Sequence, residues 1–247
     1  MRRWLLQAAL APLALLTSIN FPASALEIKV EQLASASYTV VRVDPNHDRL
    51  QLFPGDDTNK SLKGFAALNK KLAGAGQTLQ FAMNAGMFER DLSPVGLLVI
   101  DGQELAPLNL ARGFGNFYLK PNGVFMLTDA GARVLESSEY RQWPGKVLLA
   151  TQSGPLLVQH GAIHPSFNPQ STSRLIRNGV GVTSSGEVVF AISETPVNFF
   201  EFATLFRDVL RCPDALYLDG NVSSLFIPAL GRNDARARLG PIIGVVQ

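Results

Sequence analysis

Polar residues follow an apolar, strand-like run at several places in the sequence, and the last of these places offers the most chemistry. There, the run 215–218 ends at Asp219, which is followed by Gly220. A carboxylate at a strand end can act as a general base, a nucleophile or a metal ligand. The alternative is an ordinary Asp-Gly turn in which Asp219 caps its own backbone. The polar residues that come next, which are candidate ligand contacts, are Asn221, Ser223 and Ser224.

Two arginines mark a second place, just before the apolar, glycine-spaced run that starts at Asn178. Arg174 and Arg177 stand ahead of this run. The planar guanidinium group of arginine suits a phosphate or a carboxylate, because it can donate two parallel hydrogen bonds. A surface ion pair is the alternative for either arginine taken singly.

The other two places are turns that could present backbone or small polar groups to a ligand. In one, the strand-like run 79–83 leads into Asn84-Ala85-Gly86. Asparagine tolerates left-handed backbone, and a glycine such as Gly86 lets a ligand approach the chain closely. In the other, the run 147–151 leads into Ser153-Gly154-Pro155 and resumes at 156–159. Each segment could equally be an ordinary turn.

The motifs of several familiar enzyme classes are missing. The chain has no G-x-S-x-G, H-E-x-x-H, G-x-x-x-x-G-K-[ST] or G-x-G-x-x-G sequence. His160 and His164 stand four apart, but Gly161 and Pro165 argue against a helix that would present them as a metal pair. One cysteine, Cys212, excludes a disulfide framework and a cysteine-rich metal site. An acyl hydrolase using Ser153 remains a further alternative, although it would lack the nucleophile elbow.

Strand-like runs and turns dominate the elements that must position these residues. Strands outnumber helices and hairpins outnumber crossovers, which predicts an α+β fold: a strand-rich mixed or antiparallel sheet with hairpins and a few packed helices. Hairpin turns are predicted at Pro121-Asn122-Gly123 and Ser184-Ser185-Gly186. The predicted strands are 37–43 with 50–53 as its partner, 79–83, 95–100, 114–120, 123–128, 147–151, 156–159, 180–183, 188–192, 215–218 and 241–246.

Two helices are predicted, over 61–72 and over 198–210. The second is the stronger prediction, because Asn198 and Glu201 form a capping box ahead of an apolar face. Pro213 follows its end. This helix leads directly into the strand that ends at Asp219.

Residues 1–25 have the pattern of an export signal. A basic start at Arg2 and Arg3 precedes an apolar run, and Ala23-Ser24-Ala25 matches a cleavage site. We therefore expect cleavage after Ala25, one mature domain over 26–247, a periplasmic or secreted location, and no membrane span after cleavage.

The charge balance narrows the class of partner. The chain has 22 Lys and Arg against 20 Asp and Glu, a formal net charge of +2, and the excess lies in the predicted signal. The predicted mature domain is formally neutral, so nucleic acid is not an expected partner. Any attraction for an anion must be local, with Arg177 as the first candidate and Arg174 as the second.

Taken in order, the four segments resemble the phosphodiester glycosidase domain family. The family reads N-G-G-F-F, then a G-G-P loop, then R-T-A-I-G, then L-D-G-G-G-S-S, and the resemblance covers roughly residues 75–246. This chain departs from it at Ala85, at Met87 and at Asn221-Val222, where the family has glycine, phenylalanine and two glycines. The oligomeric state stays open.

The resemblance implies hydrolysis of a sugar-1-phosphodiester, of the N-acetylglucosamine-1-phosphate type, at the C1–O bond. It implies that Asp219 is the catalytic carboxylate and that Arg177 binds the phosphate. Asn84, Ser223 and Ser224 would hold hydroxyl or phosphate oxygens. The backbone at Gly86 and Gly154 would line the pocket, with Ser153, Arg174, Gly220 and Asn221 as further contacts.

Glycosidases usually employ two carboxylates, and the second is not fixed by the resemblance. Glu194 is the first candidate because it follows a predicted strand, and Glu89 and Asp91 are others. No cofactor is required, although a divalent cation on Asp219 could neutralise the phosphodiester. The alternative function is a non-catalytic periplasmic protein that binds a glycan or phosphoglycan in the same pocket. The side chains at 221 and 222 favour that alternative, and Asp219 with Arg177 favours the enzyme.

Overall fold

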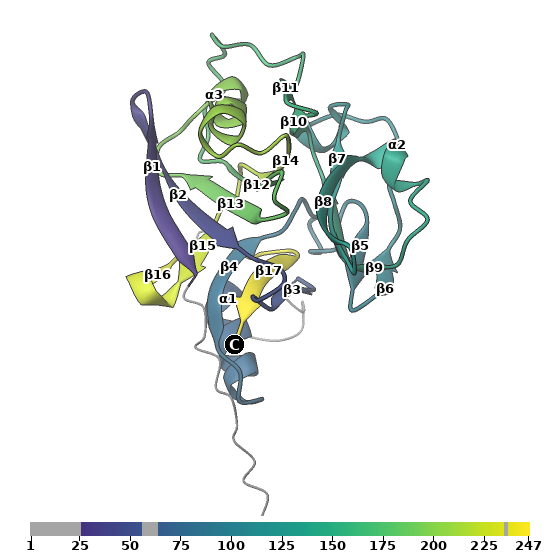
Figure 1. Ribbon diagram of the computed structural model, residues 1–247, viewed down its shortest axis with the longest axis vertical. Coiled ribbons are helices and arrows are strands. Elements are labelled where there is room, and N and C mark those ends of the chain that lie inside the picture. Colours follow the sequence, from purple (N-terminus) through teal and green to yellow (C-terminus); the bar gives the residue numbers. More distant parts are fainter. Residues whose placement is uncertain (1–25, 56–63, 235–236) are drawn as a thin grey trace, which may run out of the picture.

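The computed structural model describes residues 26–55, 64–234 and 237–247 (Figure 1). The predicted export signal and the first residues of the predicted helix 61–72 lie outside these ranges. Within them, no helix combines the length and the apolar character needed to cross a membrane.

The largest sheet has seven strands, and all of its neighbouring strands pair antiparallel. Its inner strands are apolar runs buried on both faces, as expected for strands covered on both sides. In spatial order the strands are β1 Glu27–Leu33, β2 Ala36–Val43, β13 Val188–Ser193, β12 Asn178–Val182, β14 Asp214–Asp219, β10 Leu156–Gln159 and β11 Ala162–Ile163.

Two further sheets, each of five strands, are also antiparallel. The second sheet has the order β16 Arg232–Asn233, β15 Leu225–Ile227, β4 Leu79–Asn84, β17 Ile242–Val246 and β3 Leu50–Phe53. The third has the order β6 Gln103–Ala106, β5 Leu98–Ile100, β9 Val147–Ser153, β7 Gly123–Thr128 and β8 Gly131–Glu136.

The three sheets surround one apolar core to which each contributes. Phe190 of β13 lies at its centre, with ring centroids 5.0 Å from Phe81 of β4 and 6.2 Å from Phe125 of β7. Each of these three rings comes from a different sheet. The core therefore joins segments that are far apart in the sequence.

Helices cover the outer faces of the sheets (Figure 1). α3, Phe199–Thr204, continues into a π-helical turn η2, Leu205–Val209, and both pack on the large sheet. α1, Gly64–Ala73, covers the second sheet. α2, Ser137–Tyr140, lies beside β7 and β8, and the single turns η1, Asn116–Tyr118, and η3, Pro228–Leu230, complete the helical elements of the described chain.

The strand-rich, antiparallel architecture with few helices confirms the coarse prediction of fold class. The hairpin β12–β13 is present, and Asn198 and Glu201 form the predicted capping box at the start of α3. The mixed sheet that was the alternative does not occur, because every pairing among the described strands is antiparallel. The described strands also form three sheets rather than one.

Several local predictions are wrong, and most of these errors concern which strands are partners. β3 pairs with β17 instead of β2. The segment 114–120 contains the turn η1 instead of a strand, and β7 pairs with β8 and β9. β9 and β10 do not form a hairpin, because β9 belongs to the third sheet and β10 to the first. Turn residues mark where a strand ends, but they do not determine where the next strand goes.

Candidate functional site

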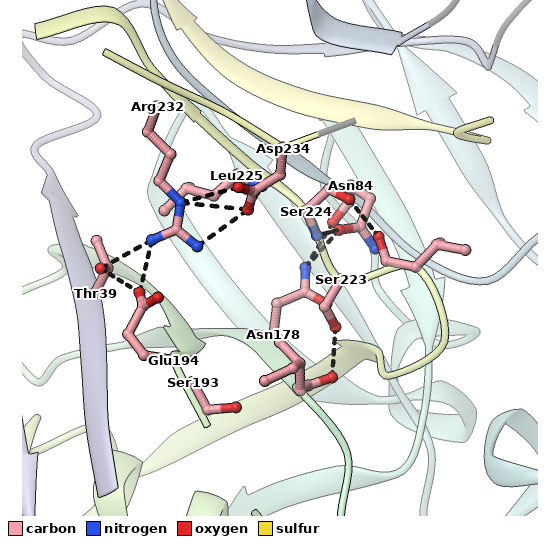
Figure 2. A network of polar contacts seen from close by, with 12 residues as sticks. Thr39, Asn84, Asn178, Ser193, Glu194, Ser223, Ser224, Leu225, Arg232 and Asp234 are labelled. Atoms are coloured by element: carbon pink, nitrogen blue, oxygen red, sulfur yellow. Dashed lines mark hydrogen bonds and ion pairs between the residues drawn. The ribbon is translucent and has the colours of Figure 1, made fainter. Parts of the chain in front are cut away.

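The ends of β4, β12 and β14 meet where the first two sheets adjoin, and we call this place the sheet junction. Asn84 at the end of β4 is fully buried, and its Oδ1 accepts hydrogen bonds from Asn178 Nδ2 at 3.1 Å and from the backbone N–H of Ser224 at 2.9 Å (Figure 2). Three of the four predicted segments therefore come together through one asparagine side chain.

The segment around Ser153 reaches the same place from the third sheet. Ser153 Oγ donates to the carbonyl oxygen of Leu218 at 3.0 Å, and Thr151 Oγ1 donates to the carbonyl oxygen of Ala85 at 2.7 Å. A Cβ on Gly154 would lie 2.5 Å from Asn122 Cβ, so this glycine permits close packing. These contacts make Ser153 and Gly154 structural residues of the sheet junction.

The hydroxyl groups of the two serines after Asp219 also form hydrogen bonds within the protein. Ser223 Oγ lies 2.9 Å from the carbonyl oxygens of Ile176 and Asp219, and Ser224 Oγ donates to the carbonyl oxygen of Val222. Both serines are buried. Together with Asn84 they hold the loop in place, and none of the three lines the adjacent cavity.

A cavity of about 560 Å³ opens beside the sheet junction. Its walls come from three parts of the chain: the loop after β14 with Tyr217, the loop after β4, and the segment around η1. The lining residues are Met87–Glu89, Val95, Phe114–Tyr118, Tyr217 and Asp219–Val222. Asp219, Gly220 and Asn221 are therefore predicted site residues that reach it, and so is the alternative carboxylate Glu89.

Asp219 is 6% exposed, and its carboxylate is held by the turn that follows it. Oδ1 accepts hydrogen bonds from the backbone N–H of Asn221 at 2.6 Å and of Val222 at 3.1 Å. Burial raises the pKa of Asp219 above its ordinary value, and these backbone N–H groups partly offset the increase by stabilising the ionised form. Asp219 therefore both caps the Asp-Gly turn and lines the cavity, so the two interpretations of this residue hold together.

Tyr217 lies two residues before Asp219 on β14, and both residues line the cavity. A Cβ on Gly220 would lie 2.0 Å from the Tyr217 hydroxyl oxygen, so only glycine leaves room for that hydroxyl. Burial raises the pKa of Tyr217, which keeps the hydroxyl protonated. Sequence reasoning missed Tyr217, although its position two residues before Asp219 could have indicated it.

Arg177 lies behind Tyr217 and does not line the cavity. Nη1 donates to the Tyr217 hydroxyl at 3.1 Å, Nε donates to the carbonyl oxygen of Val197 at 2.8 Å, and Nη2 donates to that of Ser173 at 3.0 Å. The guanidinium carbon lies 3.8 Å from the centroid of the Phe199 ring. Arg177 therefore reaches the cavity through Tyr217, and its direct contact with a ligand stays a prediction.

The charge of Arg177 is unusual because the side chain is 0% exposed and forms no ion pair with a described residue. Burial lowers the pKa of its guanidinium group, and the interaction with Tyr217 partly offsets this. A buried cation without a counterion is costly, so an anion near Tyr217 would be favoured.

Glu194, the first candidate for a second carboxylate, lies in another network. Its Oε1 accepts from Thr39 Oγ1 at 2.6 Å and from Arg232 Nη1 at 2.6 Å (Figure 2). Arg232 also contacts Asp234 at 3.0 Å. Glu194 does not line the cavity, whereas Glu89, an alternative candidate, does.

The remaining predicted contacts lie away from the cavity wall. Arg174 is exposed and pairs with Glu201 at 2.7 Å, as its surface alternative predicted. Gly86 precedes the lining residue Met87, and a Cβ on it would lie 3.0 Å from Thr151 Oγ1. His164 is buried and stacks on Phe167.

The residues present do not form a metal centre by themselves. Asp219 and Glu89 are the acidic side chains among the lining residues. No group of three or more His, Cys, Asp or Glu side chains in the described ranges is arranged to hold a metal ion. The cation on Asp219 stays a prediction.

Comparison with known proteins places the chain in a class. A family model described as phosphodiester glycosidase matches residues 77–246, which is most of the chain. The chain belongs to the phosphodiester glycosidase family. The matched range includes every residue that lines the cavity.

The chain is similar to a bacterial protein and to a vertebrate enzyme of known structure. The uncharacterised protein YigE of Escherichia coli K12 is 33% identical over 195 residues, covering 79% of this chain and 75% of that protein. The zebrafish N-acetylglucosamine-1-phosphodiester α-N-acetylglucosaminidase catalytic domain, in a structure auto-inhibited by its pro-peptide, has the same fold. Its TM-score is 0.64 at 13% identity, with 92% of this chain and 85% of that chain covered.

A bacterial structure shares the fold as well. A putative exported protein of Burkholderia pseudomallei matches with a TM-score of 0.53 at 11% identity, covering 85% of this chain and 74% of that chain. At these identities the solved structures show the fold alone.

Proposed function

We propose that this protein is an exported hydrolase that cleaves a sugar-1-phosphodiester, of the N-acetylglucosamine-1-phosphate type, between the sugar C1 and the phosphate oxygen. The observation that carries the proposal is the arrangement of Asp219 in the cavity next to a tyrosine hydroxyl, which is backed by a buried arginine that forms no ion pair with a described residue. Family membership and the zebrafish structure support the same class of reaction.

In this proposal, the anionic phosphate of the substrate binds near Tyr217. The hydroxyl oxygen of Tyr217 accepts a hydrogen bond from Arg177, and the side chain of Asn116 also bonds to this hydroxyl. In the proposal, the hydroxyl donates its proton in a hydrogen bond to a phosphate oxygen. Arg177 supplies a positive charge behind that hydroxyl. Its attraction for a phosphate is stronger in this buried environment than it would be in water. Arg177 is therefore a positioning residue, and Tyr217 makes the contact.

Asp219 is the general base in this proposal. It accepts a proton from a water molecule whose oxygen attacks C1. The C1–O bond breaks with its electron pair passing to the phosphate oxygen, so the products are the free sugar and a phosphomonoester. A phosphate needs little help from an acid to leave, and Glu89 is assigned to orienting the sugar hydroxyls.

Release of free sugar tests the proposal. Residues 26–247 are incubated with methyl N-acetylglucosamine-1-phosphate, the methyl diester, and the free N-acetylglucosamine is measured. Asp219→Ala and Asp219→Asn should abolish release. Glu194→Gln is the matched control, because it changes a carboxylate outside the cavity. NMR of the first product should show inversion at C1, since one displacement by water inverts the centre.

The alternative is a non-catalytic glycan- or phosphoglycan-binding protein. The side chains of Asn221 and Val222 line the cavity where the family motif has glycine, and this observation favours the alternative. Neither residue has a positive φ, so the loop accepts them without strain. Binding of the methyl diester without turnover would establish the alternative and refute the hydrolase.

Export remains part of the proposal. The pattern of residues 1–25 and the exported description of the Burkholderia structure support it. Fractionation of cells that produce the full chain should place the mature protein, beginning at Leu26, outside the cytoplasm.

A further inference from the structure

One edge of the first sheet has no neighbouring strand among the described residues. β1 pairs with β2 on one side and is the outermost strand on the other (Figure 1). With seven residues it is the longest of the edge strands in the three sheets. Short length, a bulge or a proline usually keeps an edge strand from pairing with another chain. β1 has no proline, and its pairing with β2 shows no register shift.

The backbone groups at this free edge are those of Ile28, Val30 and Gln32. Ser37 of β2 stands opposite Gln32, and its carbonyl oxygen accepts from the N–H of Glu194 at 2.9 Å, on the side away from β1. Opposed residues of an antiparallel pair either bond to each other or both point away, and the two cases alternate along the strand. The N–H and C=O groups of Gln32, and then of Val30 and Ile28, therefore point outward.

The charges of β1 are complementary to those of a second β1. In an antiparallel pair of two β1 strands centred on Val30, Lys29 of each copy stands opposite Glu31 of the other. Ile28 stands opposite Gln32, and Val30 stands opposite itself, so the outward backbone groups of the two copies meet. All seven residues of the strand are paired in this register.

Neighbouring registers bring like charges together. Sliding one copy by two residues keeps the outward backbone groups in phase, but it places the two copies of Lys29, or the two copies of Glu31, opposite each other. Glu31 has no ion pair with a described residue. Val30 is 63% exposed. The register centred on Val30 gives Glu31 a partner and covers Val30.

We infer that β1 is a docking surface for a second copy of this chain, through an antiparallel β1–β1 pair centred on Val30 that joins the two large sheets. One strand edge is a small interface, which fits a weak, concentration-dependent dimer. This inference does not depend on the proposed function, because β1 lines no part of the cavity beside the sheet junction.

Charge reversal tests the register. Residues 26–247 are studied by analytical ultracentrifugation, and the native protein should form dimers as its concentration rises. Lys29→Glu and Glu31→Lys should each raise the Kd of the dimer about tenfold or more, because each places like charges opposite one another twice. An equimolar mixture of the two variants should form dimers again, since each copy supplies the charge that the other lacks. Lys146→Glu, the same change at an exposed residue outside β1, is the control.

Two further measurements test the edge itself. The amide hydrogens of Ile28, Val30 and Gln32 should exchange more slowly as the native protein is concentrated. Val30→Pro removes an outward N–H, which an edge strand tolerates, so it should abolish dimers with little change in Tm. If Val30→Pro does not fold, the charge variants decide.

Three results would overturn the inference. The first is a native protein that stays monomeric up to about 1 mM, which leaves the edge to a strand of a different protein. The second is a dimer that Lys29→Glu and Glu31→Lys leave intact. The third is a mixture of these two variants that forms no more dimer than either variant alone.

Discussion

At the scale of the single residue, two opposing effects act on the pKa of Asp219. Burial favours its neutral form, and the backbone N–H groups of Asn221 and Val222 favour its ionised form. The net result is a raised pKa. A carboxylate with a raised pKa is a stronger base than a solvent-exposed aspartate, which suits proton transfer from water.

The raised pKa makes Asp219→Asn informative about stability as well as activity. Because the folded state holds this proton more tightly than the unfolded chain, ionisation of Asp219 destabilises the fold above the pKa of the unfolded group. The amide removes that cost and still accepts the backbone hydrogen bonds. We expect Tm at pH 7 to be equal or higher in the variant, with the gain shrinking as the pH falls below about 4.

Activity should respond in the opposite direction. Asp219→Asn should lower kcat at least about 10²-fold, the usual contribution of a general base. In the native protein, kcat/KM should fall as the pH decreases through the raised pKa of Asp219, above the ordinary value of about 3.9. A clear drop in Tm would contradict the stability part, and a pH-independent kcat/KM would contradict the assignment of the base.

Two buried tyrosines provide a matched pair of substitutions. Tyr217→Phe leaves Arg177 Nη1 without its acceptor, so the free energy of unfolding should fall by about 1–3 kcal/mol, and KM for phosphodiesters should rise. The hydroxyl of Tyr38 has no hydrogen-bond partner in the described ranges, so Tyr38→Phe should be neutral or stabilising. Urea unfolding of both variants, with kinetics of the first, checks this. Equal effects on stability would refute the proposed role of Arg177.

At the scale of elements, Arg232 links two sheets. It extends from β16 of the second sheet, contacts Glu194 just after β13 of the first sheet, and pairs with Asp234 (Figure 2). Its side chain is mostly buried, which strengthens these hydrogen bonds relative to exposed ones. Burial lowers the pKa of Arg232, but the acidic partners Asp234 and Glu194 outweigh this effect, and the pKa is raised overall.

This link predicts a stability effect without a catalytic one. Arg232→Ala should lower the free energy of unfolding by about 1–3 kcal/mol, because it leaves two acidic groups without their partner, while KM stays unchanged. A double-mutant cycle with Glu194→Gln should give a coupling of about 0.5 kcal/mol or more. Strict additivity of the two substitutions would argue that the contact is only incidental.

At the scale of the whole molecule, one ring connects the three sheets. Phe190 packs against Phe81 and Phe125, which come from the two sheets to which it does not belong. All three rings are fully buried. The sheet junction is thus supported from beneath by a core shared among all sheets.

Phe190→Ala should therefore lower the free energy of unfolding by about 3–5 kcal/mol. The substitution leaves a cavity among three sheets, and these sheets cannot all move inward to fill it. Denaturant unfolding followed by two spectroscopic probes should show one transition at a lower midpoint. Phe114→Ala, which removes an exposed ring, is the control and should leave the midpoint unchanged. Two separate transitions in Phe190→Ala would show that the sheets unfold independently.

The sequence by itself determined the local elements and the identity of the key segments. Strand composition, the Asn198–Glu201 capping box and the order of the four polar segments are local properties, so they predicted β2, β4, β12–β14 and α3 with little error. The same segments resembled the family that the comparison confirmed. Asp219 was identified because its turn follows a clear strand.

Only the tertiary structure decided what each polar side chain does. Asn84 and Ser153 have the residue types of a binding site, yet the groups that bond to Asn84 Oδ1 and Ser153 Oγ belong to the protein itself and lie 65 to 140 residues away in the chain. Arg177 does not line the cavity, because Tyr217 lies between its guanidinium group and the cavity. A hydrogen-bonding group bonds to whatever the fold brings near it, and local sequence carries no record of that neighbour.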